Sequence, residues 1–145
     1  MSEIWKPVVD FEEYYEVSNC GNVRTVDRYV YDKNGKSRHI KMKNITKQID
    51  RNGYYKVDIR NDYYRKTITI HRLMAIAFLP NPENKPCVNH IDGNKLNLNL
   101  SNLEWVTYSE NNKHAVDNGL RKSPWIGKFG KNMPVSKPVL QYDIK

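Results

Sequence analysis

Hydrophobic and polar residues alternate most clearly over residues 54–70 of this 145-residue chain. Between Tyr54 and Arg60 every second residue is apolar, and the residues between them are charged. A period of two is typical of a strand that buries one face. Three dipeptides favour tight turns, Asn34-Gly35, Asn52-Gly53 and Asn61-Asp62. The pattern therefore predicts a series of antiparallel hairpins with one apolar and one basic face.

The segment before these hairpins, residues 4–30, shows the same pattern with shorter strands. Tyr15–Val17 and Val23–Val26 are predicted to be extended, and Asn19–Asn22 to form the turn between them. Four large apolar side chains can pack a small β core here: Trp5, Phe11, Tyr15 and Val17. Residues 1–70 are therefore expected to form a β-rich region.

The apolar period changes from two to a helical spacing near residue 70. Five residues form the new stripe: Ile70, Leu73, Met74, Ala77 and Phe78. The stripe predicts a short buried helix that ends before Pro80, because proline cannot continue a helix. His71 lies beside the stripe and is expected to pack or to hydrogen-bond rather than to bind a metal. His39 falls in a polar hairpin and is expected to be exposed.

Residues 87–119 predict a strand, a turn, a second strand and a helix. Asp92-Gly93-Asn94 supplies the turn, and the apolar run Leu103–Val106 supplies the second strand. Thr107 and Glu110 have the spacing of a capping box, in which each residue binds the backbone N–H of the other. A helix is therefore predicted to begin directly after Thr107.

This helix should cover residues 108–117, since Asn118-Gly119 is a helix stop. Asn111 and His114 are three residues apart and therefore lie on one face of it. The preceding hairpin can bring His90 next to that face. A cation and a nucleic-acid phosphate could both be bound there, near the positive end of the helix dipole.

The net charge of +8 is unevenly distributed along the chain. Residues 21–72 contain fourteen basic and five acidic residues, and residues 113–145 contain seven and two. Residues 73–112, between them, contain two basic and four acidic residues. A slightly acidic centre between basic flanks suits a protein that holds a cation against nucleic acid. A basic surface that serves solubility alone accounts for the total charge but not for this segregation.

Several other classes of protein are excluded. The longest apolar run, Leu73–Leu79, is too short to span a membrane. The acidic amino terminus lacks the apolar core of a signal peptide. Cys20 and Cys87 lie far apart without a Cys-x-x-Cys pair, which argues against a structural zinc site and a disulfide framework. This cysteine usage suits a reducing cytoplasm.

Three stretches of the chain resemble the ββα-metal core of HNH nucleases, in the branch found in phage and intron-encoded homing endonucleases. They are Asn89–Asn94, Asn102–Thr107 with Asn111, and the helical lead-in His71–Phe78. The amino-terminal segment is similar to the NUMOD4 module, which often precedes this branch and is associated with DNA binding. The resemblance implies an α+β fold, with amino-terminal antiparallel hairpins and sheet followed by the ββα-metal core. The expected regions are 1–70 (DNA binding), 71–119 (catalytic core) and 120–145 (a basic extended arm laid on the domain or on DNA).

The resemblance also implies roles for individual residues. His90 would be the general base, Asn102 would tie the loop together and orient His90, and Asn111 would complete the catalytic set. A divalent ion, expected to be Mg²⁺, would be bound by Asn89 and Asn111. His114, one helical turn from Asn111, is a further candidate ligand. Many members have Asp where this chain has Asn89, and an amide brings no charge to the metal.

The function implied is a metal-dependent DNA endonuclease that cuts one strand per site. Its expected partner is double-stranded DNA, with neither a membrane nor a small-molecule cofactor, in the cytoplasm of a bacterial or phage-infected cell. The expected DNA contacts are Arg24, Arg28, Lys56, Arg60, Arg65, Lys122 and Lys128, although basic side chains on a strand face also serve solubility. The alternative is a non-catalytic DNA-binding protein that keeps the ββα fold. The presence of both His90 and Asn111 favours the enzyme.

Overall fold

The structure is a computed structural model and describes residues 2–120. Its helices and strands, in chain order, are β1 (Trp5–Pro7), β2 (Tyr15–Ser18), β3 (Val23–Thr25), β4 (Arg28–Tyr31), β5 (Ser37–Ile40), β6 (Lys43–Asn44), β7 (Gln48–Ile49), β8 (Tyr55–Arg60), β9 (Arg65–Thr69), α1 (Ile70–Phe78), β10 (Cys87–His90), the 3₁₀ helix η1 (Leu100–Asn102), β11 (Leu103–Val106) and α2 (Tyr108–Asp117). Neither described α-helix has the length and apolar character needed to cross a membrane.

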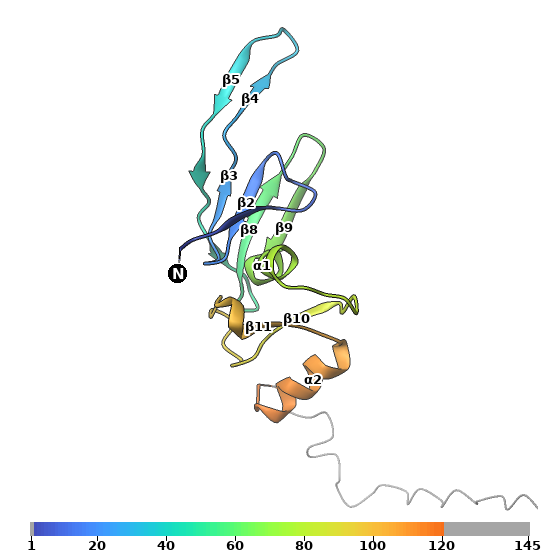
Figure 1. The fold of residues 1–145 in the computed structure, drawn as a ribbon. Coiled ribbons are helices and arrows are strands. Elements are labelled where there is room, and N and C mark those ends of the chain that lie inside the picture. The colour runs from blue at the N-terminus through green and yellow to red at the C-terminus, as the bar shows by residue number, and fades with distance from the viewer. Residues whose placement is uncertain (1, 121–145) are drawn as a thin grey trace, which may run out of the picture.

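The strands form four antiparallel sheets, with the orders β1-β2-β3-β6, β4-β5, β7-β8-β9 and β10-β11. Figure 1 shows the β4–β5 hairpin at one end of the described chain and α2 at the other, with α1 between them. This arrangement confirms the α+β fold class, with β hairpins first and a strand–strand–helix unit last.

Short polar side chains fix the turns that the sequence predicts. The Asp32 carboxylate accepts from the backbone N–H of Asn34 and Lys36 at 2.9 Å each, which closes the β4–β5 turn. Asp50 accepts in the same way from Asn52 and Tyr54 before β8. An Asp side chain that replaces a backbone acceptor favours a tight turn over a longer loop, so the register of each hairpin is set locally.

One hydrophobic core joins the β-rich region to the strand–strand–helix unit. The helix α1 contacts β2, β8 and β9 on the amino-terminal side and β10 and β11 on the other. Its residues Ile70, Met74 and Ala75 are fully buried. Val17, Val57 and Ile59 pack against it from the sheets, and Leu103 packs against it from β11. The two regions are therefore positioned relative to each other by the burial of one helix.

A second contact between the regions is made at Gly21, in the β2–β3 turn. Gly21 has a φ of +74°, and a Cβ there would lie 2.5 Å from Leu98 Cδ1 and 3.2 Å from Met74 Sδ. The turn therefore needs glycine both for its backbone conformation and for the close approach of the loop that precedes η1.

Replacing Gly21 with Ala is expected to destabilise the protein more than replacing Gly35, whose φ is +78°. Either alanine is forced into the left-handed region, at about 1–2 kcal/mol. At Gly21 the contact with Leu98 adds about 1–3 kcal/mol of overpacking, whereas nothing lies within 4 Å of a Cβ at Gly35. Urea unfolding of both variants measures the difference. Equal losses of stability would contradict the packing of Leu98 on this turn.

Candidate functional site

A polar pocket of about 290 Å³ lies between the β10–β11 hairpin and α2. Four of the predicted site residues line it together: Asn89, His90, Asn111 and His114. Tyr54 and Lys95, which the sequence analysis did not assign to the site, also line it. The predicted hairpin and the predicted helix therefore bring these four residues together in one cavity.

The loop that closes the hairpin is tied together by Asn102. Its Oδ1 accepts from the Asp92 backbone N–H at 3.0 Å, and its Nδ2 donates to Asp92 Oδ1 at 2.9 Å. Asn97 donates to the other carboxylate oxygen of Asp92 at 2.7 Å. These two side-chain donors, and then the backbone N–H of Asn94, lower the pKa of Asp92. Asn102 is buried and does not line the pocket, so it acts through the loop.

His90 is the innermost of the four pocket residues, with 4% of its surface exposed. Its ring centroid lies 4.9 Å from that of His71 and 5.8 Å from that of Tyr54. Burial lowers the pKa of His90 below its ordinary value, and Lys95 acts in the same direction, against the charge of Asp92. The imidazole is therefore neutral at pH 7 and able to accept a proton.

His71 packs against His90 from the first turn of α1. It is buried, its ring lies 4.9 Å from that of Tyr54, and its Nδ1 has no hydrogen-bond partner among residues 2–120. Burial, reinforced by the charges of His90 and Arg72, lowers its pKa to about 4. His71 is a packing residue, as its place beside the apolar stripe predicts.

Tyr54, from the β-rich region, and Lys95, from the loop after β10, line the pocket together with His90. The Lys95 ammonium donates to the Asn52 carbonyl at 2.9 Å and lies 4.8 Å from the centre of the Tyr54 ring. The contact joins the turn before β8 to the loop after β10, which are 43 residues apart. No local pattern in the sequence marks either residue for this site, because the contact depends on how the two regions pack.

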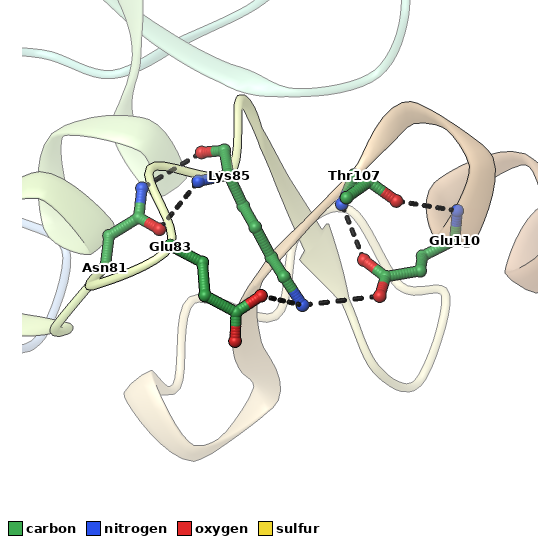
Figure 2. Close-up of polar contacts among 5 residues, drawn as sticks. All are labelled: Asn81, Glu83, Lys85, Thr107 and Glu110. Carbon is green, nitrogen blue, oxygen red and sulfur yellow. Dashed lines mark hydrogen bonds and ion pairs between the residues drawn. The ribbon is translucent and has the colours of Figure 1, made fainter.

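The amino terminus of α2 is fixed by a network of ion pairs and hydrogen bonds (Figure 2). Thr107 accepts from the Glu110 backbone N–H at 3.2 Å, and the Glu110 carboxylate accepts from the Thr107 backbone N–H at 2.6 Å, which confirms the capping box. Lys85 lies between Glu110, at 3.3 Å, and Glu83, at 3.5 Å. Asn81 closes the loop before Lys85 through two backbone contacts. The helix start is therefore tied to the segment before β10.

Asn111 follows directly on this network. No residue of the range 2–120 makes a hydrogen bond to its side chain, and it lines the pocket. His114 is oriented by the hairpin, since its Nε2 lies 2.9 Å from the Ile91 carbonyl oxygen. A carbonyl only accepts, so Nε2 carries the proton and Nδ1 of the neutral ring keeps its lone pair.

The donors in the pocket fit a hard cation. Asn89 and Asn111 offer amide oxygens, of the kind that Mg²⁺ and Ca²⁺ accept. Among the described residues, no group of three or more His, Cys, Asp or Glu side chains is arranged to hold a metal ion. The protein donors are therefore neutral, and a cation held by them would need further oxygen ligands from water or from a phosphate.

The residues predicted to contact DNA fall into different environments. Arg24 is half-buried, 2.7 Å from Glu16, with its guanidinium 3.9 Å from the Trp5 ring. Arg65 lies 2.8 Å from Asp58. Both are already paired within the β-rich region, and their contact with DNA stays a prediction. Lys56, on the β8 face shared with Asp58 and Arg60, also stays a prediction. Lys122, Lys128 and most of the predicted arm 120–145 lie outside the described residues.

Arg28 and Arg60 instead meet at one cleft of about 430 Å³, where Arg38 joins them from β5. None of the three forms an ion pair with another residue of the described range. Arg28 lies 4.5 Å from the centre of the Tyr14 ring, and its buried Nε has no partner within that range. Arg38 was not among the residues predicted to contact DNA, because the sequence of a hairpin alone does not show that β5 faces this cleft.

Comparison with known proteins agrees with the fold and the pocket. The NUMOD4 motif matches residues 3–60, and the HNH endonuclease family matches residues 69–113. A protein of Acanthamoeba polyphaga mimivirus, "Uncharacterized HNH endonuclease L245", is 42% identical over 118 residues, which are 81% of this chain and 31% of that protein. The DNA endonuclease I-HmuI of Bacillus phage SP01 is 32% identical over 134 residues, 90% of this chain and 70% of that protein.

A solved structure that describes DNA binding and cleavage by the HNH homing endonuclease I-HmuI is also similar. It has a TM-score of 0.62 and 33% identity, and the match covers 83% of this chain and 62% of that one. The chain therefore belongs to the HNH homing endonucleases, with a NUMOD4 motif before the HNH region. The resemblance found in the sequence is confirmed. The chain spans less than a third of the mimivirus relatives that it matches.

The burial of His71 gives a prediction for the pH dependence of stability. The folded chain holds the pKa of His71 at about 4, against 6.5 for a free imidazole, so the unfolded chain binds the extra proton first as the pH falls. Stability should be complete above pH 6.5 and decline toward pH 4, by about 3 kcal/mol for this group. His90 contributes in the same direction.

Replacing His71 with Gln should therefore flatten the decline in melting temperature between pH 7 and pH 5. The measurement is the melting temperature of this variant and of the wild type across that range. A His71→Gln variant whose slope matches that of the wild type would contradict the low pKa of His71.

Proposed function

We propose that this chain is a metal-dependent DNA endonuclease that hydrolyses phosphodiester bonds in double-stranded DNA. The observation that carries the proposal is the pocket shared by His90, Asn89, Asn111 and His114. A buried imidazole with a lowered pKa lies there beside amide oxygens suited to a hard cation. Membership of the HNH homing endonucleases, and the similarity to a DNA endonuclease of a Bacillus phage, support this reading.

His90 acts as the general base. Neutral at pH 7, it takes the proton of the water that attacks the phosphorus, a step for which a positioned base contributes about 10²–10⁴ in rate. Asn89 and Asn111 would hold the cation, Mg²⁺, and His114 is a further candidate ligand through Nδ1. When bound, the cation neutralises charge on the phosphate and on the leaving 3′ oxygen. Asn102 is a positioning residue, because it holds the loop and not the substrate.

One pocket of this kind handles one phosphodiester bond at a time. A monomer would therefore nick one strand per visit, since the second strand presents its phosphate with the opposite polarity. The test is incubation of supercoiled plasmid with the full chain, with and without Mg²⁺. Conversion to the open circular form that requires Mg²⁺ supports the proposal. Plasmid that stays supercoiled with Mg²⁺, Mn²⁺ or Ca²⁺, while the chain binds DNA, would instead make it a DNA-binding protein without cleavage activity.

Replacing His90 with Ala should lower the rate of plasmid nicking about 10²–10⁴-fold, because the attacking water loses its base. The affinity for DNA should change little, since His90 is buried and carries no charge at pH 7. The rate is measured under saturating protein and the affinity by a binding titration. Nicking at the wild-type rate with the same metal would remove His90 from the role of base.

The amino-terminal region contributes a second DNA surface at the Arg28–Arg38–Arg60 cleft. Three guanidinium groups line this cleft, and none of them forms an ion pair within the described range; the carboxylate that also lines it, Asp62, accepts a hydrogen bond from Tyr14. The cleft therefore has a net positive charge that attracts an anion. Arginine binds phosphate oxygens through paired N–H groups, so a DNA backbone phosphate suits this cleft. The residues that line the cleft come from β2, β3, β4, β5 and β8 and the adjoining turns. Figure 1 shows these strands on the opposite side of α1 from α2.

Replacing Arg38 with Gln should weaken DNA binding and reduce the slope of log affinity against log salt by about 0.9, the value for one lost phosphate contact. Nicking at saturating protein should be unchanged, because Arg38 lies outside the pocket of His90. The matched control is Lys66→Gln, which removes the same charge from a side chain that lies 3.9 Å from Asp10. Equal salt slopes for the two variants would show that the cleft does not bind a phosphate.

A further inference from the structure

Asn89 is paired with a carboxylate across the hairpin. In the register of β10 and β11 it lies opposite Glu104, and its Nδ2 donates to Glu104 Oε1 at 2.9 Å. Asn89 is 7% exposed and Glu104 is half-buried, so this contact is partly shielded from water. Glu104 does not line the pocket of His90 but a neighbouring hollow beside Trp105. The Glu104 carboxylate therefore contacts Asn89 from outside the pocket of His90.

This contact determines which atom of Asn89 faces the pocket. An ionised carboxylate accepts hydrogen bonds and cannot donate them, so the NH₂ side of the amide must point to Glu104. The amide group is planar, and Oδ1 is then the polar atom left for the pocket. No residue in the range 2–120 donates a hydrogen bond to that oxygen. Without Glu104 the amide could present either its oxygen or its NH₂ group, and only the oxygen can bind a cation.

Glu104 also brings the negative charge that the neutral donors in the pocket lack. A hydrogen bond from an amide to a carboxylate polarises the amide and makes its oxygen a stronger donor to a cation. The carboxylate is hydrogen-bonded to the NH₂ group of the same amide. It is therefore close enough to attract a divalent ion at Oδ1 without binding that ion itself. The negative charge is thus on Glu104, whereas the atom that would bind the cation is Asn89 Oδ1.

We propose that Glu104 is a positioning residue, which fixes Asn89 Oδ1 toward the pocket and supplies the charge for a divalent cation there. The inference rests on the proposed function, because it gives Asn89 the role of a metal ligand. It also explains why Asn occupies position 89. An Asp there would place two carboxylates at hydrogen-bond distance, and like charges at that distance repel each other strongly.

The test is a Mn²⁺ titration followed by electron paramagnetic resonance, since Mn²⁺ accepts the same oxygen ligands as Mg²⁺. All variants are made in the full chain with His90→Ala, so that a duplex of about twenty base pairs present at saturation stays intact. The reference is His90→Ala alone. Glu104→Gln should raise the Kd for Mn²⁺ about 10–100-fold, the usual effect of removing a group that orients a ligand. Asn89→Asp should also raise it, because the new carboxylate faces Glu104.

The double variant Asn89→Asp with Glu104→Gln separates positioning from packing. It restores a hydrogen bond of the opposite polarity, from the Gln amide to the Asp carboxylate, with the same net charge as the reference. Its Kd should return to within about threefold of the reference or lie below it, although each single change weakens binding. Glu83→Gln is the control, because it removes one charge near Lys85 from a side chain that is 72% exposed. It should leave the Kd unchanged.

Three results would overturn the inference. The first is a Kd for Glu104→Gln equal to that of the reference, with circular dichroism showing an intact fold. The second is a double variant whose Kd for Mn²⁺ is raised by the combined effect of the two single changes. The third is a Kd for Mn²⁺ that, across all the variants, rises only as far as the melting temperature falls. If Glu104→Gln does not fold, the double variant still decides, because it keeps the cross-strand hydrogen bond. Plasmid nicking by the wild-type chain tests the proposed function separately.

Discussion

The burial of α1 is the constraint on which the rest of the structure depends. This helix offers apolar residues to the sheets on one side and to the β10–β11 hairpin on the other, so neither region has a complete core without it. Ile70 and Met74 are fully buried, and Leu73 nearly so. Burying side chains of this size contributes about 1.5–3 kcal/mol each, as an upper estimate. Because His71 lies on the same helix, the packing that holds the regions together also shields His90.

The pocket itself depends on two local sets of contacts, one in the loop between β10 and β11 and the other at the start of α2. The Asp92–Asn102 contacts hold the loop between β10 and β11, so that the strand carrying Asn89 and His90 ends in a defined geometry. The Lys85–Glu110 contact and the capping box fix the first turn of α2, in which Glu110 directly precedes Asn111. Asparagine and aspartate are suited to the first set because their short side chains reach neighbouring backbone groups. The second set relies on a longer lysine that spans two elements.

Much of this fold could be predicted from the sequence, because its signals are local. The hairpin turns follow from Asn-Gly and Asx side chains, the helix α1 follows from the spacing of its apolar residues, and α2 follows from a capping box. The predicted and observed ranges of α2 are the same, Tyr108–Asp117. The meeting of Asn89, His90, Asn111 and His114 was also predictable, since a hairpin followed by a helix brings these positions together. Family resemblance supplied the roles that spacing alone does not give.

The contacts that could not be predicted are those made between regions or across strands. Tyr54 and Lys95 reach the pocket only because the turn before β8 packs against the loop after β10, and no pattern within either segment shows this. Arg24 appeared free to bind DNA because its partners, Glu16 and Trp5, come from neighbouring strands whose register is a property of the fold. Glu104 alternates with apolar residues as any exposed strand residue does. Its partner becomes visible only with the strand register.

The electrostatics of the pocket favour a neutral His90, although two carboxylates, Asp92 and Glu104, belong to the same hairpin. A carboxylate in direct contact with His90 would raise the pKa of the imidazole and favour its protonated form, whereas burial and Lys95 lower that pKa. The charge of Asp92 acts in the opposite direction, but its oxygens already accept hydrogen bonds from Asn94, Asn97 and Asn102. Glu104 is separated from the pocket by the amide of Asn89. In the proposed function, a cation is attracted while His90 stays neutral, and this agrees with a pocket lined by amides and not by carboxylates.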